Sequence, residues 1–510
     1  MRLTWARWGL VLALACGAVS YALSTRSAEP PAARARAETP TGAATRAEVV
    51  TVGKPLAVRP ITPGFLGLST EFSAVEPYVG TDPRALNPAL LQLIRNLSPG
   101  QRPVLRIGGD STDWAWVPTA AIRRPDGIRI DLARRWLAVT RSLARSLNAK
   151  LMLGINLEAD SRELASTEAR AFVSRIGRAH IQSLELGNEP ELYHAFPWHT
   201  TASGKALPGR GPGWSFSSYL RDYTKIASAL PRVPLAGPAI GSPGWLVDTG
   251  AFARAQRRAK TITLHRYPLQ RCPAAAPAYV PTIAELLAPA ASAGLADSVI
   301  PTARAAHAAG DSVRVDEMNS VACGGASGVS NTFASALWAV DALFQMARIG
   351  VDGINIHTFN SAIYGLFRTQ QVRGVWSADV RPEYYGLLLF AQAAPPGSHL
   401  LSVSRTSTSL RAWATRARDG RTRVVLINDS GSWRQIAVRV PGQHGDGTLE
   451  RLRAPGLGAT TGVTLGGRTF GPRTTTGRFT GAPRTQAITP RGSSYAVSLP
   501  PASAALMTLR

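Results

Sequence analysis

Two glutamates stand at the ends of short apolar runs, where a β-strand would deliver a side chain to the edge of a sheet. Glu189 closes the run from Leu184 to Asn188, and Glu317 closes the run from Ser312 to Asp316. Cleavage of a glycosidic bond needs one carboxyl group that protonates the leaving oxygen and a second that attacks the sugar or activates water. The pair therefore predicts glycoside hydrolysis.

The two glutamates are expected to divide this chemistry according to their surroundings. The acid must keep its proton near neutral pH, which needs a partly apolar environment or a nearby negative charge, whereas the nucleophile must stay ionised. We assign Glu189 as the acid/base and Glu317 as the nucleophile, which gives a retaining double displacement if the carboxyl groups lie about 5 Å apart. Asn188 is expected to hold the 2-hydroxyl of the sugar. The structural alternative, a turn at Glu189 and a surface charge at Glu317, fits poorly with the apolar runs that precede both.

Further polar side chains share this position at the ends of apolar runs. They are Arg106, His265, Tyr267 and His357, and each has a plain structural alternative as a buried ion pair or a core side chain. Other chemistries lack their motifs, because the sequence contains no H-E-x-x-H, G-x-S-x-G or Walker A pattern. The eight histidines are dispersed, so we expect neither a metal nor another cofactor.

The segments that must position these residues alternate between strand-like and helix-like patterns. Apolar residues recur at helical spacing between the β-rich runs, for example over 130–147 and 333–347. About eight such units predict a (β/α)8 TIM barrel over residues 61–393, with the functional groups at the carboxyl ends of its strands. The expected strands are Phe65–Ser69, Val104–Ile107, Lys150–Asn156, Ser183–Leu186, Pro234–Gly237, Thr261–His265, Val313–Asp316 and Gly353–His357.

The pattern of apolar and polar residues changes at about residue 394. Short alternating segments rich in Thr, Val and Arg follow, and no long helical pattern remains. Residues 394–510 are therefore expected to form a β-sandwich domain. The strand-like segment 49–60, which precedes the barrel, is a candidate to join the same sheets.

The N-terminal segment has the layout of an export signal. Two arginines precede an apolar run from Gly9 to Leu23, and small residues follow within residues 1–28. The run is shorter than a typical membrane span, and the alternative to a cleaved leader is an uncleaved anchor or a lipid-modified Cys16. Residues 29–48 have the composition of a disordered tether. We expect an exported protein, secreted or periplasmic, that meets a membrane only if this segment is retained.

The cysteines suit an oxidising compartment. The chain has three, and Cys16 lies in the leader, so Cys272 and Cys323 remain as an even pair. They follow the sixth and seventh expected strands, which are neighbours in a barrel. We predict that they form a disulfide that braces the loop behind Glu317. Two free buried thiols are the alternative.

The chain is strongly basic, with 57 Lys plus Arg against 32 Asp plus Glu and a formal net charge of +25. Such a charge favours an anionic polymer or a membrane surface as a partner. The arginines are scattered, however, and no concentrated basic face with interleaved aromatic residues is visible. We therefore expect a carbohydrate as the partner and no nucleic acid.

Five stretches together resemble glycoside hydrolase family 79, the β-glucuronidases related to heparanase, within the broad clan of retaining (β/α)8 glycosidases. The likeness runs from about residue 60 to 393. Its motifs are LGLSTEFS at 66–73, LRIGGDSTD at 105–113, EPELY at 189–193, EMNS at 317–320 leading to CGG at 323–325, and GVSNTFASALWA at 328–339.

The resemblance implies the same roles for Glu189 and Glu317 and adds substrate-binding residues. It implies that Glu71, Asp110 and Asn188 contact sugar hydroxyls and that Tyr267 lies beside the nucleophile. It also implies that the substrate carboxylate is contacted by Gly324, Gly325 and Tyr364. Backbone N–H groups of adjacent glycines suit an anion, because nothing blocks its approach. The sequence departs from the family pattern at Ser242, Ala322 and Cys323.

The expected activity is the removal of terminal β-linked glucuronic acid from glycans by an exo-acting, retaining enzyme. Three alternatives stay open. The first is another clan member, such as a β-xylosidase or an arabinofuranosidase, and the second is an endo-acting, heparanase-like enzyme. The third is a glycan-binding protein without catalysis. The sequence does not predict the oligomeric state.

Overall fold

The structure is a computed structural model that describes residues 47–272 and 279–510. The leader predicted for residues 1–28 and nearly all of the tether predicted for 29–48 lie outside the described residues. The described residues belong to one compact unit.

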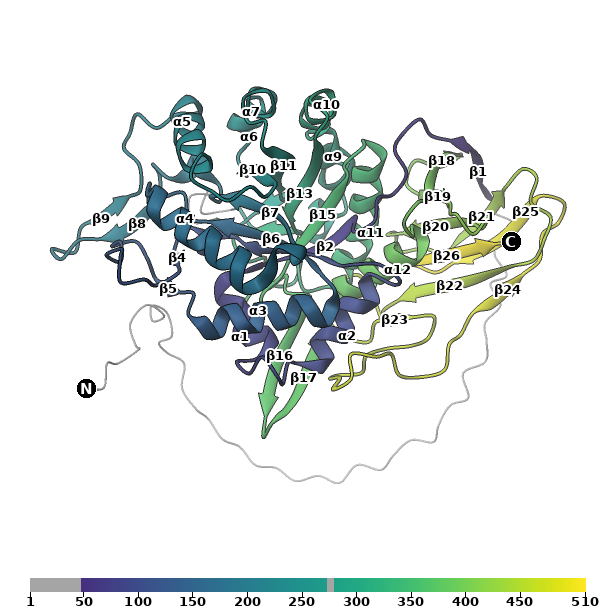
Figure 1. Cartoon of the computed structure of the whole chain (residues 1–510). Coiled ribbons are helices and arrows are strands. Elements are labelled where there is room, and N and C mark those ends of the chain that lie inside the picture. The colour runs from purple at the N-terminus through teal and green to yellow at the C-terminus, as the bar shows by residue number, and fades with distance from the viewer. Residues whose placement is uncertain (1–46, 273–278) are drawn as a thin grey trace, which may run out of the picture. The chain divides into compact units, whose positions relative to one another are not determined.

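Eight parallel strands close into a barrel, which confirms the predicted (β/α)8 fold (Figure 1). Each expected strand is present, with limits that differ by a few residues. The barrel strands are β2 (Leu66–Glu71), β3 (Val104–Gly108), β6 (Lys150–Ile155), β7 (Ile181–Leu186), β10 (Leu235–Ile240), β11 (Ala259–Arg266), β13 (Ser312–Met318) and β15 (Gly353–His357).

Helices cover the outside of the barrel, as Figure 1 shows. Their apolar residues face the strands, and several begin at a side-chain cap: Asn87 accepts the backbone N–H of Leu90, and Ser215 accepts that of Ser218. The principal helices are α2 (Pro88–Leu97), α3 (Arg134–Leu147), α4 (Arg162–Ala171), α5 (Phe216–Ala227), α7 (Thr249–Ala255), α10 (Ile300–Ala308), α11 (Phe333–Arg348) and α12 (Pro382–Ala393).

Helix α11 is buried on nearly every side because it lies between the barrel and a second sheet. Phe344 of this helix stacks on Trp413 of the sheet, with ring centroids 5.4 Å apart. Asp341 of the same helix accepts a hydrogen bond of 2.8 Å from the indole nitrogen of Trp413. A single apolar core therefore runs from the barrel through α11 and α12 to one face of the second sheet.

The domain predicted as a C-terminal β-sandwich is present as a single ten-stranded sheet that curls around an apolar core of its own. The order along the sheet is β23-β22-β26-β20-β19-β18-β1-β21-β25, with β24 paired to β22. Its strands are β18 (His399–Arg405), β19 (Arg411–Arg416), β20 (Thr422–Asn428), β21 (Arg434–Arg439), β22 (Gly447–Arg453), β23 (Thr464–Leu465), β24 (Gln486–Ile488), β25 (Ser494–Leu499), β26 (Ser503–Leu509) and β1 (Glu48–Pro55).

Strand β1 lies within this sheet, although it precedes the barrel in the sequence. It pairs antiparallel with β18 and parallel with β21. Four shorter pairs decorate the barrel loops: β4 (Ala115–Trp116) with β5 (Ile130–Asp131), β8 (Pro197–Thr200) with β9 (Ala206–Pro208), β12 (Leu269–Gln270) with β14 (Val321–Ala322), and β16 (Phe367–Val372) with β17 (Val375–Val380). None of the helices in residues 47–272 and 279–510 is long and apolar enough to cross a bilayer.

Candidate active site

The predicted site residues gather at the carboxyl ends of the barrel strands. Glu71 is the last residue of β2, and Asp110 follows β3. Asn188 and Glu189 follow β7, and Glu317 is the second-last residue of β13. Parallel strands all end at the same rim of a barrel, so residues more than 200 positions apart in the sequence meet there. The rim is the candidate active site.

Glu189 and Glu317 face each other across this rim. One carboxylate oxygen of each, together with a ring nitrogen of His265, lies within 4.8 Å of the others. Retaining glycosidases hold their two carboxyl groups about 5–5.5 Å apart, whereas inverting enzymes leave about 6.5–9.5 Å for a water molecule. This close approach of the two side chains is compatible with direct attack on the sugar by one carboxylate.

Glu317 is held as an anion by donors on both of its oxygens. Arg106 donates to Oε2 over 2.6 Å, and the hydroxyl of Tyr267 donates to Oε1 over 2.9 Å. Burial raises the pKa of Glu317, but it is outweighed by neighbours that favour the charged form, and the pKa lies well below its usual value. These neighbours are His357, His265, Arg106 and Tyr267. An ionised carboxylate at this position is suited to nucleophilic attack.

Glu189 occupies a turn with a left-handed backbone conformation, φ 44°. Its side chain is about one-quarter exposed, and its Oε1 accepts a hydrogen bond of 2.9 Å from Nδ1 of His265. Gly241 packs against the same carboxylate, since a Cβ atom there would lie 2.2 Å from Oε1. The turn and its neighbours therefore present this carboxyl group to the open side of the site.

A second carboxylate, Glu191, lies beneath this turn and is almost fully buried. It accepts the backbone N–H groups of Gly241 and Ser242 over 2.6 and 2.5 Å. Burial, with the neighbouring charge of Glu189, raises the pKa of Glu191 to about 7. This residue fixes the loop after β10 against the loop after β7.

Arg106 is completely buried beneath the site, where it links most of the rim. Its Nε donates to Glu185 over 2.7 Å and lies 3.0 Å from Asp316, and its Nη2 donates to Asn188 over 2.8 Å. Burial raises the pKa of Asp316, but Arg106 and His265 outweigh it and the pKa is lowered overall. One guanidinium group thus orders residues from β3, β7 and β13.

Asn188 and Asp110 form the part of the rim expected to meet sugar hydroxyls. The amide of Asn188 donates to Asp110 Oδ1 over 3.2 Å, and its backbone N–H donates to Asp113 over 3.0 Å. Asp110 is open to solvent at the mouth of the site. Its partly desolvated position raises its pKa well above the usual value, and so do the charges of Glu71, Glu189 and Glu317.

Glu71 is fixed beside Asp110, at the end of the neighbouring strand β2. Its Oε2 accepts the backbone N–H of Ser111 over 2.9 Å, and its Oε1 lies 3.4 Å from Nε2 of His357. Gly109 has a φ of +70°, and a Cβ atom there would overlap the carboxylate of Glu71. The Gly-Gly-Asp turn after β3 therefore permits this carboxylate to approach.

The predicted carboxylate receptor lies beyond Glu317. Gly324 and Gly325 both have positive φ, and the Cα of Gly325 packs against the backbone N–H of Tyr364. The ring of Tyr364 lies 6.2 Å from that of Tyr267, which contacts Glu317. The two glycines and both tyrosines therefore belong to one wall of the site.

The structure joins Cys272 and Cys323 in a disulfide beside this wall. Strands β12 and β14 pair next to it, with Leu269 opposite Val321. The loops after β11 and β13 are thus linked both by hydrogen bonds and by a covalent bond just before Gly324.

Several residues that order the site were not assigned a role from the sequence. Arg106, His265 and His357 were candidates because of their strand-end positions, with a buried ion pair or a core side chain as the alternative, whereas Asp113, Glu185 and Asp316 were not predicted. All six are buried, and all except Asp113 lie within a barrel strand. That signal, an ionisable group inside a buried strand, was available in the sequence.

Glu189, His265 and Glu317 also offer three atoms in a spacing that suits a metal ion. The surroundings disfavour a cation, however, because the guanidinium of Arg106 lies 2.6 Å from Glu317. His265 Nδ1 already donates to Glu189. The donor set therefore fits an organic substrate better than a metal.

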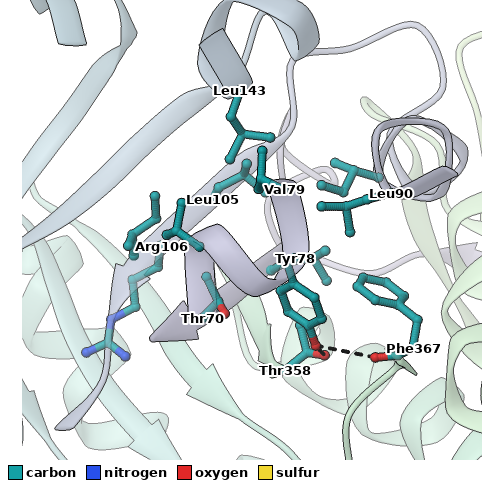
Figure 2. A pocket seen from close by; sticks show the side chains of 13 residues that line it. Thr70, Tyr78, Val79, Leu90, Leu105, Arg106, Leu143, Thr358 and Phe367 are labelled. Carbon is teal, nitrogen blue, oxygen red and sulfur yellow. Dashed lines mark hydrogen bonds between the residues drawn. The ribbon is translucent and has the colours of Figure 1, made fainter. Parts of the chain in front are cut away.

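A small apolar cavity of about 40 Å³ lies behind β2 and β3, away from the rim. Figure 2 shows it enclosed by side chains such as Leu105, Leu143 and Phe367, with the guanidinium of Arg106 pointing away from it. Tyr78 closes one side and hydrogen-bonds Thr358 over 2.9 Å. This cavity is a gap in the core between strands and helices.

Comparisons with known proteins agree with this site. No protein-family model matches the chain. It is 23% identical over 418 residues to a β-glucuronidase of Neurospora crassa, with 72% of each chain covered. The fold matches a 4-O-α-L-rhamnosyl-β-D-glucuronidase from Fusarium oxysporum 12S, with a TM-score of 0.70, 20% identity and 90% and 100% of the two chains covered. It also matches a family 51 arabinofuranosidase from Xanthomonas axonopodis pv. citri, with a TM-score of 0.65, 15% identity and coverage of 91% and 100%.

Fold, site geometry and these likenesses all point to the (β/α)8 glycoside hydrolases that carry a β-rich C-terminal domain. Within that class, the sequence is β-glucuronidase-like. The structural likenesses, at 20% identity or less, establish the shared fold.

Proposed function

We propose that this chain is a retaining glycoside hydrolase that removes terminal β-linked glucuronic acid from glycans. The observation that carries the proposal is the approach of Glu189 and Glu317 to within 4.8 Å at the barrel rim. The likeness to a β-glucuronidase supports the choice of sugar.

In the first step, a carboxylate oxygen of Glu317 attacks the anomeric carbon while the carboxyl group of Glu189 gives its proton to the glycosidic oxygen. The bond to the aglycone breaks, and a glycosyl ester on Glu317 forms. In the second step, Glu189 accepts a proton from water, whose oxygen attacks the anomeric carbon and releases Glu317. Two inversions leave the product with the configuration of the substrate.

The surrounding residues support this assignment of roles. Arg106 and Tyr267 stabilise the anion of Glu317, as a nucleophile requires. Glu189 is more open to solvent, so that both an aglycone and a water molecule have access to it. We propose that Glu71, Asp110 and Asn188, which lie at the same rim, bind the sugar hydroxyls.

The sugar carboxylate is proposed to meet Gly324, Gly325 and Tyr364. Positive φ at both glycines turns the backbone toward the site without a side chain in the way. This contact separates a glucuronidase from an arabinofuranosidase or a xylosidase, whose substrates carry no carboxylate. The exo mode of action belongs to the same proposal, and an endo-acting enzyme is its alternative.

A panel of aryl β-glycosides tests the proposal directly. We expect the wild type to hydrolyse the aryl glucuronide and to leave the xyloside and arabinofuranoside nearly untouched. NMR of the first product formed should show the β-anomer of glucuronic acid. Release of pentose instead, or the α-anomer as the first product, would refute the substrate or the mechanism, respectively.

Two variants test the catalytic pair. Glu317→Gln should lower kcat by about 10⁴-fold or more, and Glu189→Gln by about 10²–10⁴-fold, with the smaller loss for aryl groups that leave without a proton. Glu163→Gln, an exposed glutamate of α4, is the matched control and should keep wild-type activity. Turnover unaffected in either catalytic variant would show that the pairing is wrong.

We also propose that the protein is exported and that the barrel and the sheet domain meet near residue 394. The disulfide supports export, since such bonds persist in oxidising compartments. Mass spectrometry of the mature protein isolated from its host should show an N-terminus after the predicted leader. Detection of Met1 in a cytoplasmic fraction would contradict export.

A further inference from the structure

A second pocket, of about 650 Å³, opens in the ten-stranded sheet rather than in the barrel. It lies between β22, β23 and the segment that leads into β24. Three arginines, Arg451, Arg453 and Arg484, line it together with two threonine hydroxyls and the amide of Gln486. Among the described residues, its lining contains neither a carboxylate nor an aromatic ring.

The alternation of strand β22 places two of these arginines side by side. Residues two positions apart on a strand point to the same face, so Arg451 and Arg453 share the face of Leu449. Leu449 lies in the core of the sheet, whereas the arginines lie toward the end of the strand. Arg451 is fixed by neutral acceptors: Nη1 donates to Gln486 over 2.8 Å, and Nη2 donates to the carbonyl of Ser498 over 3.2 Å.

The third arginine is brought in by a tight backbone contact. The N–H of Arg484 donates to the carbonyl of Gly466 over 2.6 Å. Gly467 has a φ of +74°, and a Cβ atom there would lie 2.9 Å from the aliphatic stem of Arg484. Because Gly466 and Gly467 have no side chains, the aliphatic stem of Arg484 packs against them. This packing places the guanidinium of Arg484 at the pocket.

The three positive charges have no carboxylate partner within 4.0 Å in residues 47–272 and 279–510, although arginines elsewhere in that part of the chain, such as Arg59 and Arg473, pair with carboxylates. Burial and the neighbouring charge of Arg453 lower the pKa of Arg451. Like charges held together by neutral groups repel one another, and an anion placed among them would relieve that repulsion.

We propose that this pocket is a second, non-catalytic binding site for an acidic glycan, whose uronate carboxylates pair with Arg453 and Arg484. Planar guanidinium groups bind carboxylates through two parallel hydrogen bonds. The hydroxyls of Thr464 and Thr485 suit the sugar hydroxyls beside the charge. A single-stranded nucleic acid fits less well, because its bases stack on aromatic side chains and the pocket offers none.

The inference rests on the proposed function in its choice of glycan, since the same polymer would serve as ligand here and as substrate at the barrel. Binding at a second point raises the effective concentration of chain ends near the enzyme. The pocket would therefore matter for long acidic substrates and not for small aryl glucuronides.

The test uses the full-length protein with Glu317→Gln, which prevents turnover, and titration calorimetry with a hexasaccharide of alternating glucuronic acid and N-acetylglucosamine. We expect two sites per chain. Adding Arg453→Gln and Arg484→Gln should remove one site or weaken it by about tenfold or more. The matched control replaces Arg254 and Arg257, two exposed arginines at the end of α7, by Gln and should keep both sites.

Three outcomes would overturn the inference: hexasaccharide binding that is unchanged by Arg453→Gln and Arg484→Gln, equal binding of a neutral N-acetylglucosamine hexasaccharide at the second site, or tighter binding of an oligothymidylate there. Aryl glucuronide turnover, measured with intact Glu317, should be unchanged by the two Arg→Gln changes. If the wild type fails to cleave aryl glucuronides while the second site still binds the acidic hexasaccharide, the proposed function fails and the second site stands.

Discussion

At the scale of single residues, the site is organised by charge compensation around Arg106. This guanidinium has no exposed surface and contacts six buried side chains, those of Glu185, Asp316, Glu317, Asn188, Ser69 and His265. Removing one partner of a buried charge network leaves another charge uncompensated and costs several kcal/mol. Arg106 is therefore expected to be as important for folding as for activity. Removing one other hydrogen bond to Glu317 tests the role of this carboxylate in catalysis more directly than replacing Arg106.

Tyr267→Phe removes such a single contact, the hydroxyl that donates to Glu317. We expect kcat/KM for an aryl glucuronide to fall about tenfold to a hundredfold, because a hydrogen bond to a charged group is lost. That donor lowers the pKa of Glu317, so its loss raises this pKa and moves the acid limb of the pH profile upward. The control is Tyr495→Phe, whose hydroxyl contacts only the sheet domain carbonyl of Gly445. An unshifted acid limb would mean that Tyr267 does not act on the nucleophile.

At the scale of elements, the loop after β13 carries the proposed carboxylate receptor. Gly325→Ala should raise KM for the aryl glucuronide, because a Cβ atom would lie 2.8 Å from the backbone nitrogen of Tyr364. Gly328→Ala is the matched control, since it has a similar positive φ but no atom within 4 Å of the new methyl group. Both variants carry about 1 kcal/mol of backbone strain, so equal KM values would exclude the receptor.

Helix α11 and the second sheet form the other critical contact between elements. Trp413→Ala removes the stack on Phe344 and leaves Asp341 without its indole donor, so the free energy of unfolding should fall by about 2–4 kcal/mol. Trp433→Ala is the control, because Trp433 is 61% exposed and its loss should change stability by less than about 0.5 kcal/mol. Urea unfolding followed by circular dichroism measures both. Equal losses would show that the interface with α11 does not stabilise the fold.

At the scale of the whole molecule, many buried carboxyl groups set how stability depends on pH. Burial raises the pKa of Glu158 to about 9 and those of Glu185 and Glu191 to about 7. Such groups bind more protons in the folded than in the unfolded state between their ordinary and raised pKa values, so stability falls as pH rises through that window. Asp316 and Glu317 have lowered pKa values and act in the opposite sense. Their contribution to the stability of the folded state is lost as the pH falls below the ordinary pKa of a carboxyl group.

The protein should therefore be most stable in mildly acidic solution, at about pH 5, and lose at least about 1 kcal/mol of stability by pH 8. Thermal unfolding across this range measures the effect. Glu158→Gln should flatten part of the decline, because it removes the group with the highest of the three raised values. A melting temperature that rises steadily from pH 5 to pH 8 would contradict the expected burial of these acids.

Much of the fold could be predicted from the sequence, because the period of apolar residues is a local property. The eight strands and the helices between them each carry that period, and the β-rich end lacks the helical one. The position of Glu189 and Glu317 at strand ends followed from the same pattern. The chemical roles of the two glutamates, and of the substrate contacts, stay predictions.

The sequence by itself thus determined the barrel, the β-rich domain and the rim on which the candidate residues stand. Only the tertiary structure decided that Glu189 and Glu317 come within 4.8 Å, that Arg106 joins β3 to β7 and β13, and that the arginines of β22 meet Arg484. The physical reason is that hydrophobic periodicity acts between neighbours along the chain. Charge pairing and close approach, in contrast, depend on distances in space that closure of the barrel and curling of the sheet create.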